Sequence, residues 1–363
     1  MTATLSVVLP NHNHGHLIPR ALAALLAQEH APDEIIVVDD GSTDDSVMVI
    51  RRYAAENPTV RLLANNRNLG VIFSLNRGLQ AARGRYVYFA AADDWVMSGF
   101  FAAAIAALNA APDAGLFCGE ARLIDGASGS HMAIRPPVRP CRRAGLVDPG
   151  AARALLARMD NWILTGSAVF RRDAVVWAGG FDERLGSFAD GFVARKIALT
   201  FGFYFMPEVV AAWVIFADGV SRRIAIDPDR ARHMQTVSVE RIAADPVFPA
   251  WYPQRFDDRW RFGTSRLALA QLPVNRAALL AMGGRTSLDR RVLEVLLKLP
   301  SRRLVKLAAL TWLWVRLRPT TLTGLARTAI ARRLKQPSRT CQMAVMPTGP
   351  SAIRTMAGAT GHE

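Results

Sequence analysis

Short, almost wholly apolar segments alternate with stretches of helical periodicity over the first 120 residues, and this alternation limits the fold more than any other feature. It predicts buried strands at 5–9, 34–38, 60–64 and 86–90, and helices at 17–27, 46–56 and 70–82. Strands that are apolar on both faces need cover on both sides. The pattern therefore predicts an α/β fold with a Rossmann-like, mostly parallel sheet and helices on both faces.

The alternation weakens after residue 120. There it predicts helices at 148–159 and 190–200 and strands at 162–170 and 203–214, which complete the sheet. A mainly helical region follows Pro246, Pro249 and Pro253. The predicted division is a sheet domain over 1–225, a helical, basic C-terminal extension over 226–335 and a disordered tail over 336–363.

Basic residues are concentrated at the C-terminal end. The chain has 45 Lys and Arg against 30 Asp and Glu, and +11 of its formal charge of +15 comes from residues 295–363. The apolar stretch 304–315 is shorter than the roughly 20 residues that span a bilayer. It could lie on an anionic membrane through Leu304, Leu307, Trp312 and Trp314, or pack as an ordinary helix with a solvated basic side. Nucleic acid is not expected as a partner, because no binding module accompanies the basic residues.

The N-terminal residues carry no recognisable secretory signal, since a basic segment is missing and the apolar run ends at Pro10. We therefore expect a cytoplasmic protein, with peripheral contact at the inner face of the membrane. The three cysteines, Cys118, Cys141 and Cys341, are too few and too scattered for a disulfide scaffold or a cysteine metal site.

Polar residues follow three of the predicted strands, at 10–14, 39–42 and 91–95. Ligands of such sheets bind outside the carboxyl ends of the strands. Two of these ends carry acidic pairs, Asp39/Asp40 and Asp93/Asp94. Acidic pairs are also common in turns, but two of them at one sheet edge suit a hard divalent cation that holds a diphosphate. The cation would neutralise a departing phosphate, and another carboxylate would deprotonate an incoming hydroxyl.

Three ordered runs carry a resemblance to a known family: LSVVLPNHNHGHLIPRAL…APDEIIVVDDGSTDDS, NRNLGVIFSLNRGLQAARGRYVYFAAADD and GGFDERLGSFADGF. Over residues 4–221 the chain resembles the family 2 glycosyltransferases of GT-A fold. The resemblance implies a metal-dependent, inverting enzyme that uses Mg or Mn and a nucleotide-diphosphate sugar, often a UDP-sugar. It implies transfer to the hydroxyl of a glycan or lipid-linked acceptor, as in polysaccharide or glycolipid synthesis.

Carried over by motif, the resemblance assigns Asp190 as the base, Asp93 and Asp94 to the metal and diphosphate, and Pro10, His12, Asn13, Asp39, Asp40 and Asn76 to the nucleotide sugar. Two alternatives remain open. Asp190 could be a helix N-cap, and His12, His14 and His16 could form a metal site. Trp95 and Trp162 could stack on a sugar ring or pack in the core.

Three positions depart from the family pattern. Ala91 and Ala189 stand where relatives have acids, and Leu75 stands where many have Arg. Arg67, Arg83 and Arg85 could replace that cation or be solvated surface residues. The departures motivate a second hypothesis, a non-catalytic nucleotide-sugar binding or scaffold protein. A nucleotidyltransferase is less favoured, because no Gly-rich phosphate loop with a following Lys comes after the first strand.

Overall fold

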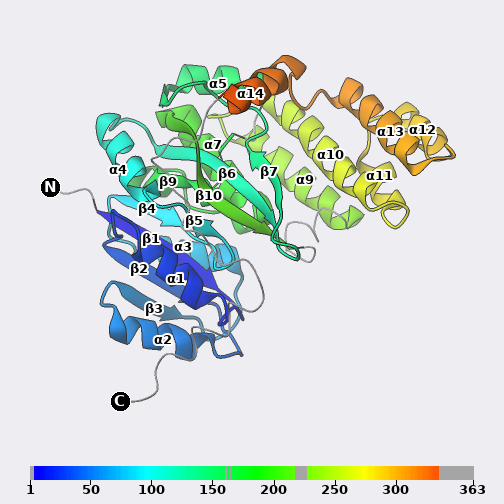
Figure 1. Cartoon of the computed structure of the whole chain (residues 1–363). Helices are drawn as coiled ribbons and strands as arrows, with labels where there is room; N and C mark the ends of the chain where they lie inside the picture. The colour runs from blue at the N-terminus through cyan, green and yellow to red at the C-terminus, as the bar shows by residue number, and fades with distance from the viewer. Residues whose placement is uncertain (1–3, 160–161, 164, 217–226, 335–363) are drawn as a thin grey trace.

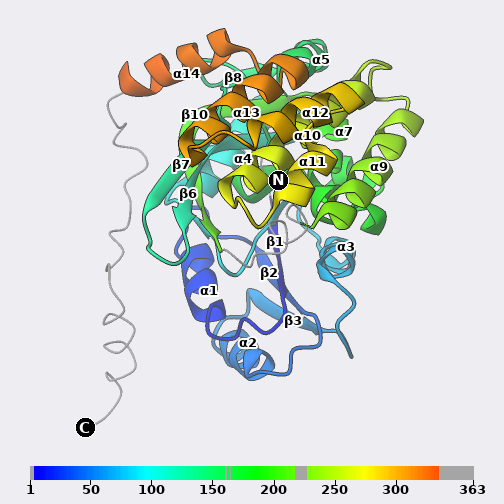
Figure 2. The ribbon, with the colours of Figure 1, turned by 90° about the vertical axis from the view of Figure 1, so that its right-hand side faces the viewer.

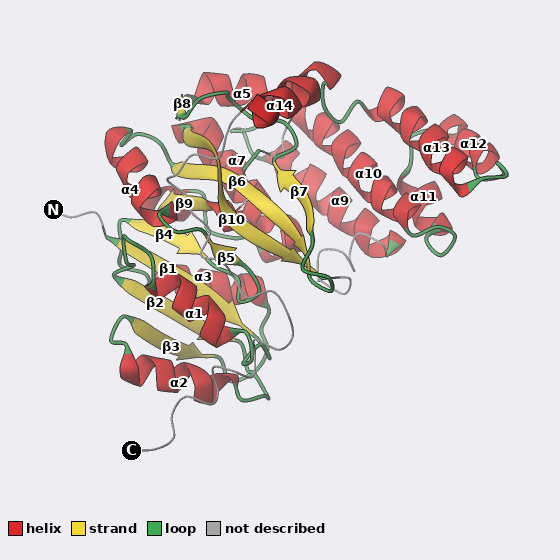
Figure 3. Cartoon of the chain, in the orientation of Figure 1, coloured by secondary structure: helices red, strands yellow, loops and turns green. Residues whose placement is uncertain are grey.

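The computed structural model describes residues 4–159, 162–163, 165–216 and 227–334. Its centre is a twisted mixed sheet in the order β3-β2-β1-β4-β9-β6-β10-β5 (Figure 3). The first four strands are parallel and close to prediction: β1 (Leu5–Asn11), β2 (Glu34–Asp39), β3 (Val60–Ala64) and β4 (Tyr86–Phe89). The parallel α/β sheet predicted for this half is confirmed.

The second half extends the same sheet with a change of strand direction. β9 (Ala168–Arg171) lies antiparallel between β4 and β6 (Leu116–Asp125), and β10 (Phe203–Ile215) runs parallel to β6. The short strands β5 (Trp95–Val96), β7 (His131–Arg135) and β8 (Gly145–Val147) pair antiparallel at the margins. The strand predicted at 162–170 was too long, because Trp162 is a buried core residue and Thr165–Ser167 form a 3-10 turn, η1.

Helices cover both faces of the sheet, as predicted. On one face α1 (Ile18–Leu26), α2 (Ser46–Glu56) and α4 (Phe100–Ala110) share an apolar core with β1, β2 and β4. On the other face lie α3 (Val71–Ala81), α5 (Pro149–Arg158), α6 (Arg172–Trp177) and α7 (Ala189–Phe201). The sequence did not predict α4, because its run of Ala and Phe has no polar face to give a helical period.

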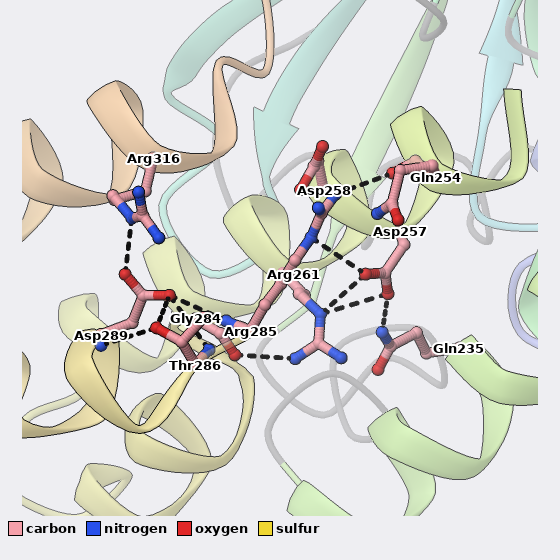
Figure 4. A network of polar contacts seen from close by, with 10 residues as sticks. All are labelled: Gln235, Gln254, Asp257, Asp258, Arg261, Gly284, Arg285, Thr286, Asp289 and Arg316. Atoms are coloured by element: carbon pink, nitrogen blue, oxygen red, sulfur yellow. Dashed lines mark hydrogen bonds and ion pairs between the residues drawn. The ribbon is translucent and has the colours of Figure 1, made fainter. Parts of the chain in front are cut away.

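The C-terminal extension is helical, as predicted, and projects to one side of the sheet (Figure 1). Its members are α9 (Pro228–Ala244), α10 (Tyr252–Ala270), α11 (Arg276–Met282), α12 (Ser287–Leu296) and α13 (Arg302–Leu317). α9 and α10 contribute to the core beneath the sheet, whereas α11, α12 and α13 surround a small core of their own. Figure 4 shows polar contacts that join them, among them the ion pair of Arg316 with Asp289 at 2.7 Å and the hydrogen bond from Arg261 to the Gly284 carbonyl oxygen at 3.1 Å.

The last described helix, α14 (Leu322–Leu334), returns to the sheet domain beside α5 (Figure 2). Glu120 on β6 is 1% exposed and binds two arginines. Its Oε2 accepts from Arg139 Nη2 at 2.6 Å, and its Oε1 accepts from Arg332 Nε on α14 at 3.1 Å. Arg332 also donates to the carbonyl oxygen of Pro136 at 2.7 Å. A buried carboxylate thus anchors the end of the extension to the middle of the sheet.

The apolar face predicted for 304–315 is not one face in the structure. The buried side of α13 is formed by Val305, Ala309, Leu313 and Leu317. Trp314 packs edge-on against Phe262, and Trp312 lies against the same small core. Leu304 and Leu307 point elsewhere and are 50% and 67% exposed.

The described helices are each too short or too polar to cross a bilayer. The predicted tail at 336–363 lies outside the described residues. The division at residues 225 and 335 stays a prediction.

Candidate active site

The candidate site lies at the carboxyl ends of β1, β2 and β4. From β1 the chain proceeds outward through β2 and β3, then returns to place β4 on the other side of β1. The strand order reverses there, which is where open α/β sheets bind ligands. The segments that follow β1, β2 and β4 therefore meet at one edge (Figure 1).

The loops after β1 and β2 hold each other through polar contacts. Asn11 Nδ2 donates to Asp39 Oδ1 at 2.9 Å, and the Ser42 hydroxyl donates to the same oxygen at 2.6 Å. His12 Nδ1 lies 2.9 Å from the carbonyl oxygen of Asp40, and the amide nitrogen of Thr43 donates to Asn13 Oδ1 at 2.8 Å. Pro10 precedes them within β1, level with Val38 of β2. The structure therefore brings the predicted nucleotide-binding residues together.

Asp40 is buried, and both carboxylate oxygens are used within the chain. Oδ1 accepts from Asn65 Nδ2 at 2.7 Å and from the Leu69 amide at 2.9 Å, while Oδ2 accepts from the Gly70 amide at 2.8 Å. Gly41 follows with a φ of +67°, and a Cβ there would lie 2.4 Å from the backbone of Arg67. Asp40 therefore fixes the loop before α3. Its contact with a nucleotide stays a prediction.

The Asn-x-Gly pair on α3 has a packing role. Asn76 Nδ2 donates to the Phe181 carbonyl at 2.8 Å, and Asn76 Oδ1 accepts from the Phe181 amide at 2.9 Å. At Gly78 a Cβ would lie 2.2 Å from Val8 Cγ1, so α3 approaches β1 closely only because the side chain is absent. Asn76 thus positions the turn before Asp182, and its contact with the donor stays a prediction.

Asp93 and Asp94 follow β4 in the loop that leads to β5. The Val214 amide on β10 donates to Asp94 Oδ1 at 2.9 Å. In the described part of the chain Asp94 Oδ2 and the Asp93 carboxylate have no hydrogen-bond partner. Burial, and secondly the charge of Asp93, raise the pKa of Asp94 to about 8. A divalent cation would offset both effects, so the pair fits a hard cation whose other ligands are water and phosphate oxygens.

A short chain of contacts links this loop to Asp190. Tyr88 on β4 donates its hydroxyl to the carbonyl oxygen of Gly166 in η1, at 3.1 Å. Burial, followed by the charge of Asp94, raises the pKa of Tyr88. The neighbouring residue Thr165 makes a side-chain hydrogen bond to Asp190. Tyr88 and Asp94 line one small cavity, so η1 connects Asp190 to a neighbour of Asp94.

Asp190 is in the first turn of α7, where its Oδ1 accepts from the Gly191 amide at 2.6 Å. The N-cap is Phe188, so the alternative that Asp190 is an N-cap is wrong. Burial raises the pKa of Asp190, against the lowering effects of Thr165, the Gly191 amide and the Arg195 charge. A carboxylate with a raised pKa is a stronger base than an ordinary one.

Other candidates lie elsewhere in the fold. Arg83 and Arg85 precede β4 and lie at the amino edge of the sheet, where their amides donate to Glu34 and Thr4. Neither can therefore replace the arginine that many relatives have at the position of Leu75. Arg67 remains at the site edge.

Trp162 is fully buried and stacks on Phe203 at 4.7 Å, which confirms its core role. The described residues contain no cluster of three His, Cys, Asp or Glu fit for a metal, and His14 and His16 stand 6.3 Å apart edge-on.

Sequence reasoning missed Tyr88, Thr165, Val214 and Arg20 as parts of the site. Arg20 donates to the Asp93 carbonyl oxygen at 2.9 Å and lies over the Trp95 ring at 5.3 Å, so Trp95 borders the site. Tyr88 is one of two tyrosines in β4, and their hydroxyl groups in a buried strand were a usable signal. The other three act across long sequence separations, 120 residues for Val214 and Asp94, and carry no local signal.

Comparison with known sequences gives matches to glycosyltransferases. The profile of glycosyl transferase family 2 matches residues 6–157. The chain is 42% identical over 95 residues to the "Uncharacterized glycosyltransferase YibD" of Escherichia coli K12, covering 26% of this chain and 27% of that protein. It is 30% identical over 223 residues to the "Uncharacterized protein MT1568" of Mycobacterium tuberculosis, covering 56% and 65%. The chain thus spans less than two thirds of either relative.

Solved structures share the fold at low sequence identity. The mannosyltransferase PcManGT of Pyrobaculum calidifontis, solved with GDP-Man and Mn²⁺, has a TM-score of 0.55 and 21% identity, covering 93% of this chain and 89% of that one. S. aureus TarS 1–349, solved with UDP-GlcNAc, has a TM-score of 0.58 and 16% identity, covering 85% and 89%. Residues 6–157 are therefore similar to glycosyl transferase family 2, and the described residues have the GT-A type fold that these solved structures share.

Proposed function

We propose that the protein is an inverting glycosyltransferase that moves a sugar from a nucleotide-diphosphate donor to an acceptor hydroxyl. The observation that carries the proposal is that η1 bonds to Asp190 through Thr165 and accepts a hydrogen bond from Tyr88, which lines a small cavity together with Asp94. One acidic group suits the leaving diphosphate and the other suits the attacking hydroxyl. The match of residues 6–157 to the profile of glycosyl transferase family 2 supports the same assignment.

The residues of the chain divide the reaction between them. Asp190 takes the proton of the acceptor hydroxyl, whose oxygen forms a bond to the anomeric carbon as the bond to the diphosphate oxygen breaks. Thr165 and the Gly191 amide hold the Asp190 carboxylate in place. Asp93 and Asp94 would hold Mg or Mn, which when bound supplies positive charge to the departing diphosphate. Val214 and Arg20 orient this loop through Asp94 and Asp93.

The donor is proposed as a UDP-sugar, with GDP-mannose as the second choice to test, because structural neighbours bind donors of both types. His12, Asn13 and Asp39 border the edge where the nucleotide would lie. The acceptor is proposed as a glycan or lipid-linked hydroxyl. Peripheral contact with an anionic membrane is also proposed, through the exposed Leu304 and Leu307 and the basic residues beside them.

Release of nucleoside diphosphate from a panel of donors tests the function. We expect turnover that is abolished by EDTA and reduced by about 10²–10⁴-fold in Asp190→Asn. The matched control is Asp173→Asn, which neutralises an exposed carboxylate paired with Arg171. NMR of the product should show an inverted anomeric centre. Full activity in Asp190→Asn would remove that residue from the mechanism. Calorimetric donor binding without turnover would instead favour the non-catalytic alternative.

A further inference from the structure

A hollow on the surface of the helical extension is lined by arginines and aliphatic side chains. α11 lies against both α9 and α12 there (Figure 2), and the three helices border an open hollow of about 550 Å³. This is within the range of roughly 300–1,000 Å³ that small-molecule sites occupy. Arg232, Arg276 and Arg290 come from the three helices, and Ala277, Leu280 and Ala281 supply the apolar floor.

The positive charge in this hollow is largely unopposed. Arg290 pairs with Glu294 on its own helix at 3.2 Å, but no carboxylate pairs with Arg232 or Arg276 in the described ranges. None of the lining residues is acidic. Two other arginines of the extension, Arg285 and Arg316, each meet an aspartate (Figure 4). Guanidinium groups that line one hollow repel one another, and a bound anion would relieve that repulsion.

The apolar lining specifies the rest of the ligand. Val274, at the turn between α10 and α11, is 86% exposed and borders the hollow. A hydrocarbon chain that covered Val274 and Leu280 would bury this surface. The planar fork of arginine matches phosphate oxygens in pairs. We infer that the hollow binds the phosphate group of an amphiphile between Arg232, Arg276 and Arg290, with the hydrocarbon chain on the apolar floor.

One helix that borders the hollow, α9, also contacts the segment that precedes the proposed base. On α9, Met234 lies against Gly186, where a Cβ would be 2.4 Å from the Met234 Cε. Gly186 is four residues before Asp190 in the segment that leads into α7. The amphiphile could be a membrane phospholipid or a phosphorylated, lipid-linked acceptor. Only the second source rests on the proposed function, and phosphate binding itself does not.

Calorimetric titration of octyl phosphate into the full chain tests the inference. We expect binding to weaken at least tenfold, or 1.4 kcal/mol, in the double variant Arg232→Ser/Arg276→Ser. The matched control is Arg291→Ser/Arg303→Ser, which removes two exposed arginines of α12 and α13 that do not line the hollow. The control should bind within twofold of the unmodified protein. Melting followed by circular dichroism verifies that both variants fold.

Inorganic phosphate has only the phosphate group of the proposed ligand, and octanol has only its hydrocarbon chain. Each should therefore bind at least tenfold more weakly than octyl phosphate. The inference is overturned if octanol binds as tightly as octyl phosphate, or if the two double variants lose affinity equally. Sedimentation with phosphatidylglycerol vesicles distinguishes the sources. Loss of vesicle binding in the Arg232→Ser/Arg276→Ser variant but not in the control variant supports a bilayer lipid. Unchanged vesicle binding beside weakened octyl phosphate binding supports a phosphorylated acceptor.

Discussion

Neutralising Glu120 should weaken the whole fold more than any exposed charge change. The Glu120 side chain is 2% exposed, and those of Arg139 and Arg332 are 8% and 21% exposed. In Glu120→Gln the two guanidinium groups would face a neutral amide that can accept at only one atom. Arg139 would then be a buried charge without a counter-charge, which is the costly outcome of breaking a buried ion pair.

The expected size follows from the burial. Removing one partner of a buried pair costs about 3–5 kcal/mol. An unfolding entropy of about 2.1 cal/mol/K per residue gives ~0.7 kcal/mol/K for a chain of roughly 330 ordered residues. The melting temperature of Glu120→Gln should therefore fall by about 4–7 °C.

Differential scanning calorimetry measures this shift. The control is Glu56→Gln, which breaks the exposed pair between Arg52 and Glu56, with side chains 80% and 57% exposed. It should lower the melting temperature by less than about 1 °C, because exposed pairs contribute only about 0.3–0.5 kcal/mol. Equal shifts in the two variants would refute the reasoning. Hydrogen exchange supplies a local readout, since Arg332→Met should increase exchange in α14 and leave β1 protected.

Three further outcomes are expected. Gly78→Ala should destabilise the protein by about 1–3 kcal/mol in urea unfolding because its Cβ meets Val8, whereas Gly263→Ala, with open space on α10, should be neutral or stabilising. Asp40→Asn should lower the free energy of unfolding by about 1–3 kcal/mol and speed amide exchange in the loop before α3. Unchanged exchange there would contradict the role of Asp40 in fixing that loop. The raised pKa of Asp190 should place the acid limb of kcat/KM above the ordinary aspartate range; a limb near pH 4 would count against it. Because the native state then holds this proton more tightly than the unfolded chain, stability should fall as pH rises through that window, and Asp190→Asn should remove that fall.

The N-terminal half of the fold was predictable because each element carries its own periodic signal. Helix α2 and strand β3 match the predicted bounds, since apolar periodicity and flanking polar residues are both local. β5, β6, β7 and β8 were not predicted, and β9 was misplaced. β7 pairs with β6, which directly precedes it, but the other pairings depend on partners far along the chain, as in β6 against β10.

The site was predictable in its residue types but less so in their contacts. Strand ends directed attention to Asp39, Asp40, Asp93 and Asp94, and the structure collects them at one edge. The sequence could not indicate that Asp40 is saturated by backbone amides or that Asn76 binds the Phe181 backbone. It also left open whether Trp312 and Trp314 pack in the protein or meet a membrane, because an apolar stripe has the same pattern in both cases.

The hydrogen bond between the Val214 amide and Asp94 has a consequence for biosynthesis. The ribosome makes the strand that supports Asp94 about 120 residues after the aspartate itself. At a translation rate of about 5–20 residues per second, the loop after β4 waits at least ~6 s for that support. A nascent chain that has emerged only as far as α7 carries every acidic residue of the candidate site, yet it still lacks the strand that fixes one of them.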